Sequence, residues 1–278
     1  MSPGPRGSGG GEIRLIVTAD DFGAALEVNE AVERGFREGI LTAASLMVSG
    51  AAAADAVARA RTMPGLGVGL HIVLADGNPT LPPEQIPALV GADGRFHDSM
   101  VRTAFAIALS PTARAQMRAE VEAQFAAFAA TSLPLDHVNA HKHFHLHPLI
   151  ASAVLVAGRK FGLRAVRVPI EPGGNPLLNW WAGRLRHRLR RAGLTANDRV
   201  AGLRDTGAFD ETAMARSLLQ LRPGLTEIYS HPATAAGWPG AAPGYRYRQE
   251  LDALTAPSVR ETLARSGART GNFASLAA

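Results

Sequence analysis

The chain has 278 residues, 46% hydrophobic and 19% charged, which is enough to bury a sizeable core in one soluble domain. It contains no cysteine, which excludes disulfides, thiolate metal ligands and thiol nucleophiles. The formal net charge of +5 is carried almost entirely by arginine. Where the arginines lie must therefore show whether this charge serves nucleic acid, an anionic membrane or solubility.

The first residues are unlike the rest of the chain. Residues 1–11 are rich in Pro, Gly and Ser and lack the apolar segment of a signal peptide, so we expect a disordered tail. One domain is expected over residues 12–278. Residues 41–58 come closest to a membrane-spanning length, but Gly50 and Asp55 interrupt them. We therefore expect a cytoplasmic protein.

Apolar periodicity predicts strands that alternate with helices along the chain. Strands are predicted at residues 14–18, 42–48, 66–74, 135–148, 165–168 and 226–230. Helices are predicted at residues 27–37, 51–63, 112–130, 149–161, 179–192, 211–221 and 257–265. Residues 75–111 have no clear period and many Gly and Pro residues, so we expect a long loop or lid. The alternation indicates βα units and a largely parallel sheet.

The stretch LDHVNAHKHFHLHP, residues 135–148, is unusually rich in histidine. Its five histidines, at alternating positions, are His137, His141, His143, His145 and His147. In a strand, residues i, i+2 and i+4 share one face, so four or five imidazoles would line one wall. Neutral imidazole is the commonest protein metal ligand, so we interpret the stretch as a metal site rather than as an adventitious His-rich tract.

Polar residues also gather at the carboxyl ends of the predicted strands, where barrel enzymes carry their chemistry. They are Asp20, Asp21, His71, His141, Arg167 and His231. An isolated Asp pair is more often a helix N-cap, and an isolated histidine is more often part of the core. Their coincidence at several strand ends instead favours a site. Two adjacent carboxylates repel each other, and a divalent cation held by one Asp and two His would relieve that repulsion. The second Asp would then be free to act as a general base.

These residues resemble the YdjC-like carbohydrate deacetylases. The motifs are ADDFG after the first strand, GLH in the third, the alternating HxHxH run and a late HP pair, and the resemblance extends from about Leu15 to the C-terminus. The patterns EVNEAVERGFREGILTAASLMV and VNAHKHFHLHP are similar to the branch associated with hopanoid biosynthesis. The resemblance implies a distorted TIM-like (β/α) barrel and a divalent metal ion such as Zn or Mg. It also implies an N-acetylglucosaminyl hopanoid as the substrate.

The resemblance further implies a role for each matching residue. It assigns metal binding to Asp21, His71 and His141, the general base to Asp20 and the general acid to His231.

Four polar residues near this set have less defined roles. Asn139 stands where the family has an acidic residue, so its role stays open, as does that of His145. We interpret His143 as a substrate contact or a support of the metal ligands. Arg167 is a candidate contact to sugar or acetyl oxygens, with a surface charge as the alternative.

The segment NWWAGRLRHRLRRA, residues 179–192, forms a basic amphipathic helix on a helical wheel. Its apolar arc consists of Leu178, Trp181, Ala182, Leu185, Leu189 and Ala192. This pattern is typical of a helix at a membrane interface, so we expect peripheral attachment to an anionic membrane at its inner face. The alternative is that the apolar arc packs on the barrel. No nucleic-acid recognition motif is present, so nucleic acid is not expected as a partner. A homodimer is left open.

Other functions fit parts of the pattern. Soluble N-acetylated sugars such as chitooligosaccharides are an alternative substrate class. Two histidines and one carboxylate also serve non-haem iron oxygenases, but those usually have a β-rich scaffold. A non-catalytic protein that binds sugar or metal would not need Asp20 beside Asp21.

Overall fold

The computed structural model describes residues 11–276, so all but the last residue of the expected N-terminal tail lies outside the described part. The strands are β1 (Ile13–Phe22), β2 (Ala43–Leu46), β3 (Gly67–Ile72), β4 (Val138–Ala140), β5 (Arg199–Ala201), β6 (Gly224–Ser230) and β7 (Arg269–Thr270). The helices are α1 (Leu26–Glu38), α2 (Ala53–Arg61), α3 (Met100–Leu109), α4 (Pro111–Ala130), α5 (Pro148–Lys160), α6 (Pro176–Arg191), α7 (Glu211–Leu219), α8 (Tyr247–Thr255), α9 (Pro257–Ser266) and α10 (Phe273–Leu276). Two 3₁₀ helices, η1 (Pro83–Gln85) and η2 (His141–Leu146), complete the set.

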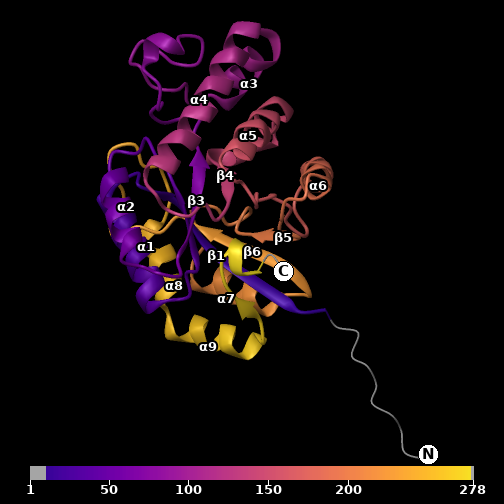
Figure 1. The fold of residues 1–278 in the computed structure, drawn as a ribbon. Helices are drawn as coiled ribbons and strands as arrows, with labels where there is room; N and C mark the ends of the chain where they lie inside the picture. The colour runs from indigo at the N-terminus through magenta and orange to yellow at the C-terminus, as the bar shows by residue number, and fades with distance from the viewer. Residues whose placement is uncertain (1–10, 277–278) are drawn as a thin grey trace, which may run out of the picture.

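The strands form one curled, parallel sheet in the order β4-β3-β2-β1-β6-β5, and β7 pairs with β1. The helices surround this half-barrel (Figure 1). Single parallel bridges join Val138 to Val166 and Ala165 to Thr195, so backbone pairing continues past β4. The predicted α/β class and parallel sheet are confirmed, in a shape consistent with a distorted barrel. The described residues form seven strands rather than the eight of a regular TIM barrel.

Most predicted helices and strands are confirmed within a few residues, but three predictions are wrong. The strand predicted at 165–168 is reduced to single bridges at Ala165 and Val166. The histidine-rich strand ends at Ala140, because Lys142 and His143 have left-handed φ angles of 53° and 55° that no strand accommodates. The predicted loop at 75–111 contains α3, which Ser99 caps by accepting a hydrogen bond from the Arg102 backbone N–H. The sequence also gave no signal for the short strands β5 and β7, or for α8 and α10.

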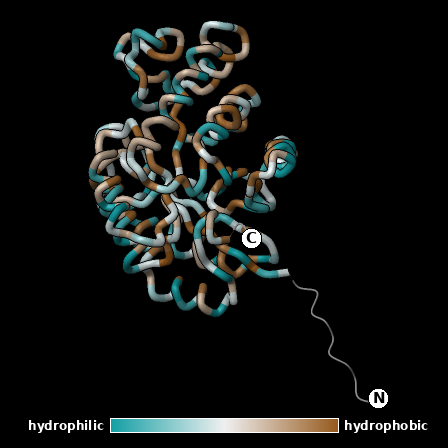
Figure 2. Tube along the Cα trace, viewed as in Figure 1, coloured by the Kyte–Doolittle hydropathy of each residue, from teal (hydrophilic) through white to brown (hydrophobic). Residues whose placement is uncertain are grey.

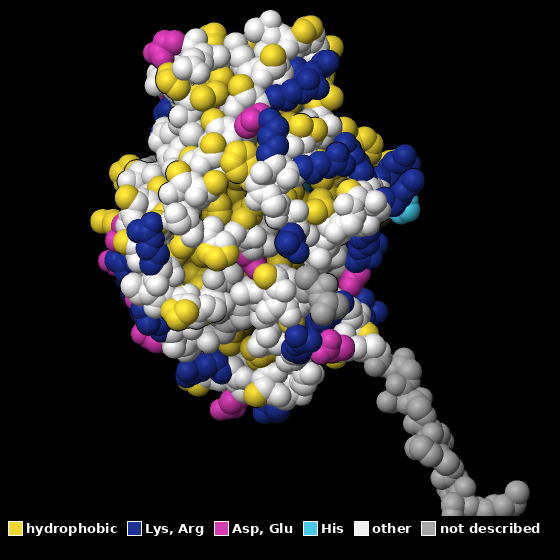
Figure 3. Space-filling view, in the orientation of Figure 1, with side chains coloured by type: hydrophobic (Ala, Val, Ile, Leu, Met, Phe, Trp, Pro, Cys, Tyr) yellow, Lys and Arg dark blue, Asp and Glu magenta, His cyan; other side chains and the backbone are white. Residues whose placement is uncertain are grey.

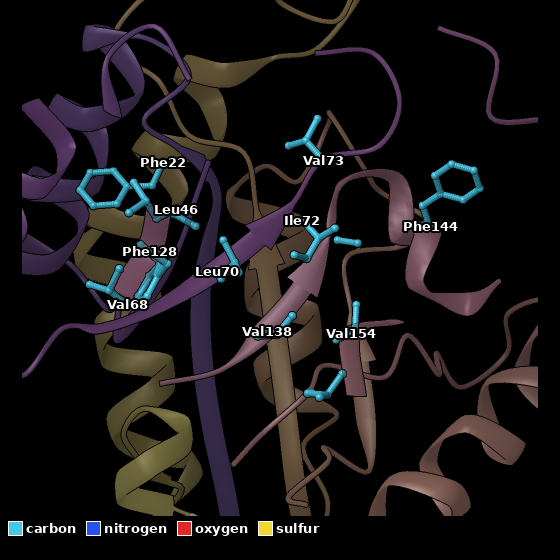
Figure 4. Packing of buried hydrophobic residues seen from close by; sticks show 14 of the residues in the cluster. Phe22, Leu46, Val68, Leu70, Ile72, Val73, Phe128, Val138, Phe144 and Val154 are labelled. Atoms are coloured by element: carbon cyan, nitrogen blue, oxygen red, sulfur yellow. The ribbon is translucent and has the colours of Figure 1, made fainter. Parts of the chain in front are cut away.

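The outer face of the sheet carries the main apolar core. Along β3, the alternate residues Val68, Leu70 and Ile72 belong to one cluster with Phe128 of α4 and Val154 of α5 (Figure 4). In the hydropathy colouring, brown residues occur along the central strands, and teal residues are common on the surrounding helices (Figure 2). The helices thus pack on the outer face of the sheet through the hydrophobic effect. The inner face of the sheet is left available for polar side chains.

The inner face is arranged in layers. An apolar plug fills the amino-terminal end of the strands, and it consists of Ile16, Ala43, Ala165, Leu225, Phe273 and Leu276. Because strand side chains alternate, the next inward residue of each strand lies one layer nearer the carboxyl edge. Those residues are polar yet buried, and they are Thr18, Ser45, Arg167 and Glu227. The carboxyl edge above them is the place for the candidate site.

Candidate metal and catalytic site

Asp20 and Asp21 reach one site because β1 bulges at its carboxyl end. In a regular strand, neighbouring side chains point to opposite faces. The pairing of β1 with β2 shifts register between Ala19 and Phe22, and Asp21 has a left-handed φ of 61°. A bulge of this kind re-aims a side chain. Both carboxylates therefore line one cavity of about 350 Å³ at the carboxyl edge of the sheet.

Asp21, His71 and His141 form a compact triangle of ligand atoms. Asp21 Oδ1 lies 3.3 Å from His71 Nε2 and 3.1 Å from His141 Nδ1, and the two nitrogens are 3.4 Å apart. Ligands held at about 2.0–2.2 Å in a tetrahedral zinc site are roughly 3.3–3.6 Å from one another. Within residues 11–276, these three form the group able to hold a metal ion. They are the three residues that the sequence motifs single out.

Asn139 orients one of these candidate ligands. His71 Nδ1 lies 2.6 Å from Asn139 Oδ1, and an amide oxygen only accepts, so Nδ1 carries the proton and Nε2 offers its lone pair toward Asp21. The Asn139 amide nitrogen donates to Asp20 Oδ1 at 3.0 Å and to Ser45 Oγ at 2.9 Å. Asn139 therefore connects the candidate metal ligand His71 with the second carboxylate, Asp20. The role of Asn139, which the sequence analysis left open, is thus to orient these two side chains.

A buried ion pair holds Asp20 in place. Arg167 Nη1 and Nη2 donate to Asp20 Oδ2 and Oδ1 at 2.5 and 3.0 Å, and Nη2 also donates to Glu227 Oε1 at 2.8 Å. Burial opposes ionisation of Asp20, but the Arg167 charge outweighs it and holds the Asp20 pKa well below its usual range. Asp20 is therefore an anion at neutral pH.

The geometry of Arg167 corrects both interpretations made from the sequence. Its side chain is 0% exposed, so it is not a surface charge. Both terminal nitrogens are bound by Asp20 and Glu227, and it does not line the cavity, so it offers no contact to a substrate. Arg167 instead fixes the position and charge of Asp20 from below.

Asp21 is likewise held as an anion. Burial raises its pKa, but the neighbouring His141 and His71 outweigh this effect and bring the pKa well below its ordinary value. A carboxylate that stays ionised in a buried position is suited to a cation. The two adjacent carboxylates can both stay ionised because Asp20 faces an arginine and Asp21 faces two imidazoles.

His143 and His231 line the same cavity. His143 Nε2 lies 3.3 Å from the Tyr229 hydroxyl, and burial, followed by the Arg167 charge, lowers the His143 pKa well below its usual value. His143 is therefore neutral at pH 7. The His231 ring contacts the rings of Tyr229 and Tyr245, with centroids 5.5 and 5.4 Å away.

Two other histidines of the stretch, His145 and His137, make buried hydrogen bonds within the fold. His145 is buried, and its Nε2–H donates to the Arg167 backbone carbonyl at 2.9 Å. Burial lowers the His145 pKa to about 4. His137 is bound between Asp136 and Ser45, at 2.9 and 3.0 Å.

Sequence reasoning missed the aromatic wall of the cavity. All three tyrosines of the chain line it, together with one tryptophan, and these residues are Tyr229, Tyr245, Tyr247 and Trp238. Residues 235–247 read as a Gly/Pro-rich connection, although aromatic residues concentrated in such a segment are a signal of a binding surface. Lys142, ion-paired with Asp76, completes the opposite rim.

The fold and site define a class, an α/β protein with a carboxylate–histidine cluster at the carboxyl edge of a curled parallel sheet. The family model of YdjC-like proteins matches residues 14–265, and the chain belongs to this family.

Named relatives are deacetylases, which are hydrolases. The chain is 31% identical over 288 residues to a carbohydrate deacetylase of Mus musculus, covering 92% of each protein. It is 30% identical over 270 residues to a chitooligosaccharide deacetylase of Yersinia pestis strain Pestoides F, covering 93% of this chain and 97% of that protein. A carbohydrate deacetylase of Brevibacillus brevis is 35% identical over 159 residues, which are 57% of this chain and 59% of that protein.

The fold also has a solved counterpart. The crystal structure of a proposed cellobiose-phosphate cleavage protein of Enterococcus faecalis V583 superimposes with a TM-score of 0.78 and 22% identity, covering 95% of this chain and 99% of that one. At this identity the similarity shows the fold alone.

Proposed function

We propose that this protein is a metal-dependent hydrolase that removes the N-acetyl group from an N-acetylglucosamine-type sugar. The observation that carries the proposal is the Asp21–His71–His141 triangle beside a second, anionic carboxylate, Asp20, in one cavity. We take residues 12–278 as one deacetylase domain. All of these side chains come from one chain, so the site needs no homodimer.

Each residue would have a defined task in amide hydrolysis. A divalent ion on the triangle would acidify a water molecule and supply positive charge near the amide oxygen. Asp20 would accept the proton of the attacking water, and His231 would give a proton to the departing amine. The low Asp20 pKa makes it a weak base, so it works on a water that is itself acidified. Its rigid pairing with Arg167 fixes the direction of proton transfer.

The aromatic wall supports a sugar as the substrate. The Tyr247 ring packs between two others, with its centroid 5.4 Å from that of Tyr245 and 4.5 Å from that of Trp238. Ring faces in a cavity suit the C–H face of a pyranose, while polar groups at the rim suit its hydroxyls. Within this class we propose an N-acetylglucosaminyl hopanoid, as the sequence motifs imply. A soluble chitooligosaccharide is the second candidate, favoured by the name of the Yersinia relative.

Acetate release tests the activity. The purified protein, loaded with Zn or Mg, should release acetate from an N-acetylglucosamine glycoside, lose this activity to a chelator and regain it when metal is restored. The same glycoside with the metal-free protein is the matched control. Metal-loaded protein that releases no acetate from either hopanoid or chitooligosaccharide substrates would contradict the proposal.

We further propose peripheral attachment at the inner face of an anionic membrane. The contact surface we propose is the beginning of α6, and not the whole apolar arc expected from the sequence. Only half of the predicted apolar arc of α6 faces inward, because Ala182, Leu185 and Leu189 are buried in the core. The exposed apolar residues cluster at the beginning of the helix and are Leu177, Leu178, Trp180 and Trp181. Basic side chains gather beside apolar ones at this side of the molecule (Figure 3). No helix within residues 11–276 is long and apolar enough to cross a bilayer.

A second exposed apolar stripe lies on α3. Val101, Phe105 and Leu109 recur every four residues along α3 and are 65%, 63% and 77% exposed. Residues four apart lie on one side of a helix. Exposed apolar clusters of this kind mark contact surfaces.

Liposome co-sedimentation tests the attachment. Trp180→Ser with Leu177→Ser should weaken binding to anionic vesicles, and salt should weaken it in the unaltered protein. Leu219→Ser is the control, because Leu219 is 79% exposed on α7. The charge on α6 is best varied at Arg184 and Arg188, since Arg186 and Arg190 are bound to Asp198. Equal binding of the double variant and the control would exclude this surface.

A further inference from the structure

A second cavity lies next to the candidate active site and is different in character. It has a volume of about 660 Å³, within the range of cavities that hold small ligands. Its walls come from η2, from the segment before α6 and from the beginnings of α3 and α6. Its apolar lining includes Met100, Phe144, Leu146, Leu178, Trp181 and Leu203.

The two cavities share a wall. Lys142, His143 and Leu203 line both of them. The two cavities are therefore adjacent, and a molecule with its sugar beside Asp21 and His141 would reach the second cavity by extending past these three residues. This adjacency distinguishes the second cavity from a surface groove that is remote from the candidate site.

The polar groups around the second cavity are mostly occupied. Glu171 accepts hydrogen bonds from the backbone N–H groups of Gly202 and Arg204, at 3.2 and 3.0 Å. The Asn179 amide pairs with the Glu171 backbone in both directions, at 2.7 and 3.1 Å. The Trp181 indole N–H donates to the Leu146 carbonyl at 2.8 Å, which leaves its ring as a wall. A ligand would thus meet apolar surface, and a strongly polar ligand would lose hydration without replacement.

Two atoms of the lining are exceptions, His147 Nδ1 and, at the shared wall, His143 Nδ1. His143 Nδ1 is buried and has no hydrogen-bond partner among the described residues, although its Nε2 faces Tyr229. A buried polar atom of this kind suits a ligand oxygen. It is placed where a sugar would be joined to a group in the second cavity.

We infer that the second cavity binds the apolar aglycone of the substrate, with His143 Nδ1 beside the oxygen that links aglycone and sugar. The inference rests on the proposed function, because it places the sugar in the first cavity. The exposed Leu178 and Trp181 form the outer lip, so a hydrocarbon held in a membrane could enter from that side. The enzyme would thereby select glycolipids over short soluble sugars.

Substrates that differ only in the aglycone test this inference. The methyl and dodecyl β-glycosides of N-acetylglucosamine are compared by acetate release, below the micelle concentration of the dodecyl compound. Each methylene buried favours binding by a factor of about four. Partial burial of the chain should therefore give the dodecyl glycoside a KM at least about tenfold lower. Equal KM values for the two glycosides would overturn the inference.

Neighbouring residues of α6 provide a matched pair of variants. Leu178 lines the cavity and is 55% exposed, whereas Leu177 does not line it and is 70% exposed. Leu178→Glu should remove most of the advantage of the dodecyl glycoside, and Leu177→Glu should keep it. Both positions are exposed, so both variants should fold. An equal effect of the two variants would overturn the inference.

A direct binding measurement separates this inference from the proposed activity. Calorimetry with the dodecyl glycoside needs no turnover. If neither glycoside releases acetate, the proposed function fails, and weaker binding of the dodecyl glycoside to Leu178→Glu than to Leu177→Glu would still support an apolar cavity. Equal binding of both glycosides to the unaltered protein would overturn it.

Discussion

His71 and His141 differ from His137 and His145 in what their ring nitrogens face. The first two direct a nitrogen toward Asp21 in the cavity. The nitrogens of His137 are engaged by Asp136 and Ser45, and His145 donates to a backbone carbonyl inside the molecule. Three of these four residues come from one histidine-rich stretch. Residue type and spacing alone therefore do not assign a role, because the turn at Lys142 and His143 sends successive histidines to different surroundings.

Removal of a cavity-facing histidine should have the largest effect. His141→Ala should lose the metal and reduce activity by more than the 10–100-fold typical of residues that only support a ligand. Metal content by mass spectrometry and acetate release are measured together. His145→Gln is the control that should retain metal. Full metal occupancy in His141→Ala would remove His141 from the proposed ligands.

Asp20→Asn separates catalysis from support of the buried arginine. Turnover should fall by about 10²–10⁴-fold while metal is retained, as expected for loss of a general base. Glu227→Gln is a matched control, because it also removes a carboxylate partner of Arg167 yet lies outside the cavity. Both variants should have a lower melting temperature, since a buried charge loses a partner. A similar loss of turnover in both would assign Asp20 a purely structural role.

Asn139→Leu should have an intermediate effect, because it leaves His71 Nδ1 without its acceptor. We expect metal affinity to fall by about 10–100-fold, measured by competition with a chelating dye. Ser45→Ala removes one hydrogen bond that the Asn139 amide donates, together with the Ser45 contact to His137, but keeps the acceptor of His71 Nδ1, so it should weaken metal binding less. Unchanged affinity in Asn139→Leu would mean that packing alone orients His71.

His145 should affect stability and its pH dependence, with the smallest change in turnover at pH 7. Its pKa of about 4 lies below the value of about 6.5 in an unfolded chain. The unfolded state thus binds more protons between these values, so stability is complete above pH 6.5 and falls as the pH drops toward 4. The loss is up to about 3 kcal/mol. Urea unfolding at several pH values should show a shallower decrease for His145→Gln. Identical slopes would exclude His145 as the titrating group.

Much of the site could be predicted because a parallel sheet gathers its strand ends at one edge. Apolar runs located the strands, and the polar residues directly after them identified Asp20, Asp21, His71 and His231 as neighbours. This inference requires only that the strands run parallel, and the alternation of strands with helices predicts that they do.

The rest depended on features without a local signal. The left-handed turn at Lys142 and His143 uses no glycine, so no residue type at this point indicates the end of the strand. The pairing of Arg167 with Asp20 and Glu227 joins residues 147 and 60 positions apart. The helix α3 could not be predicted because apolar residues occur on several of its sides, so the sequence has no helical period of hydrophobicity there. Only the burial of Thr103 and Ile107 shows which side faces the core.

The apolar plug at the amino-terminal end of the strands limits how molecules pass through the enzyme. Phe273 and Leu276 close that end, and the buried Arg167 and Glu227 fill the space above them. Substrate, water and both products must therefore enter and leave on the carboxyl side of the sheet. If that side rests on a membrane and the substrate is the proposed glycolipid, the released acetate would have to escape laterally to the solvent, whereas the deacetylated lipid could return directly to the bilayer.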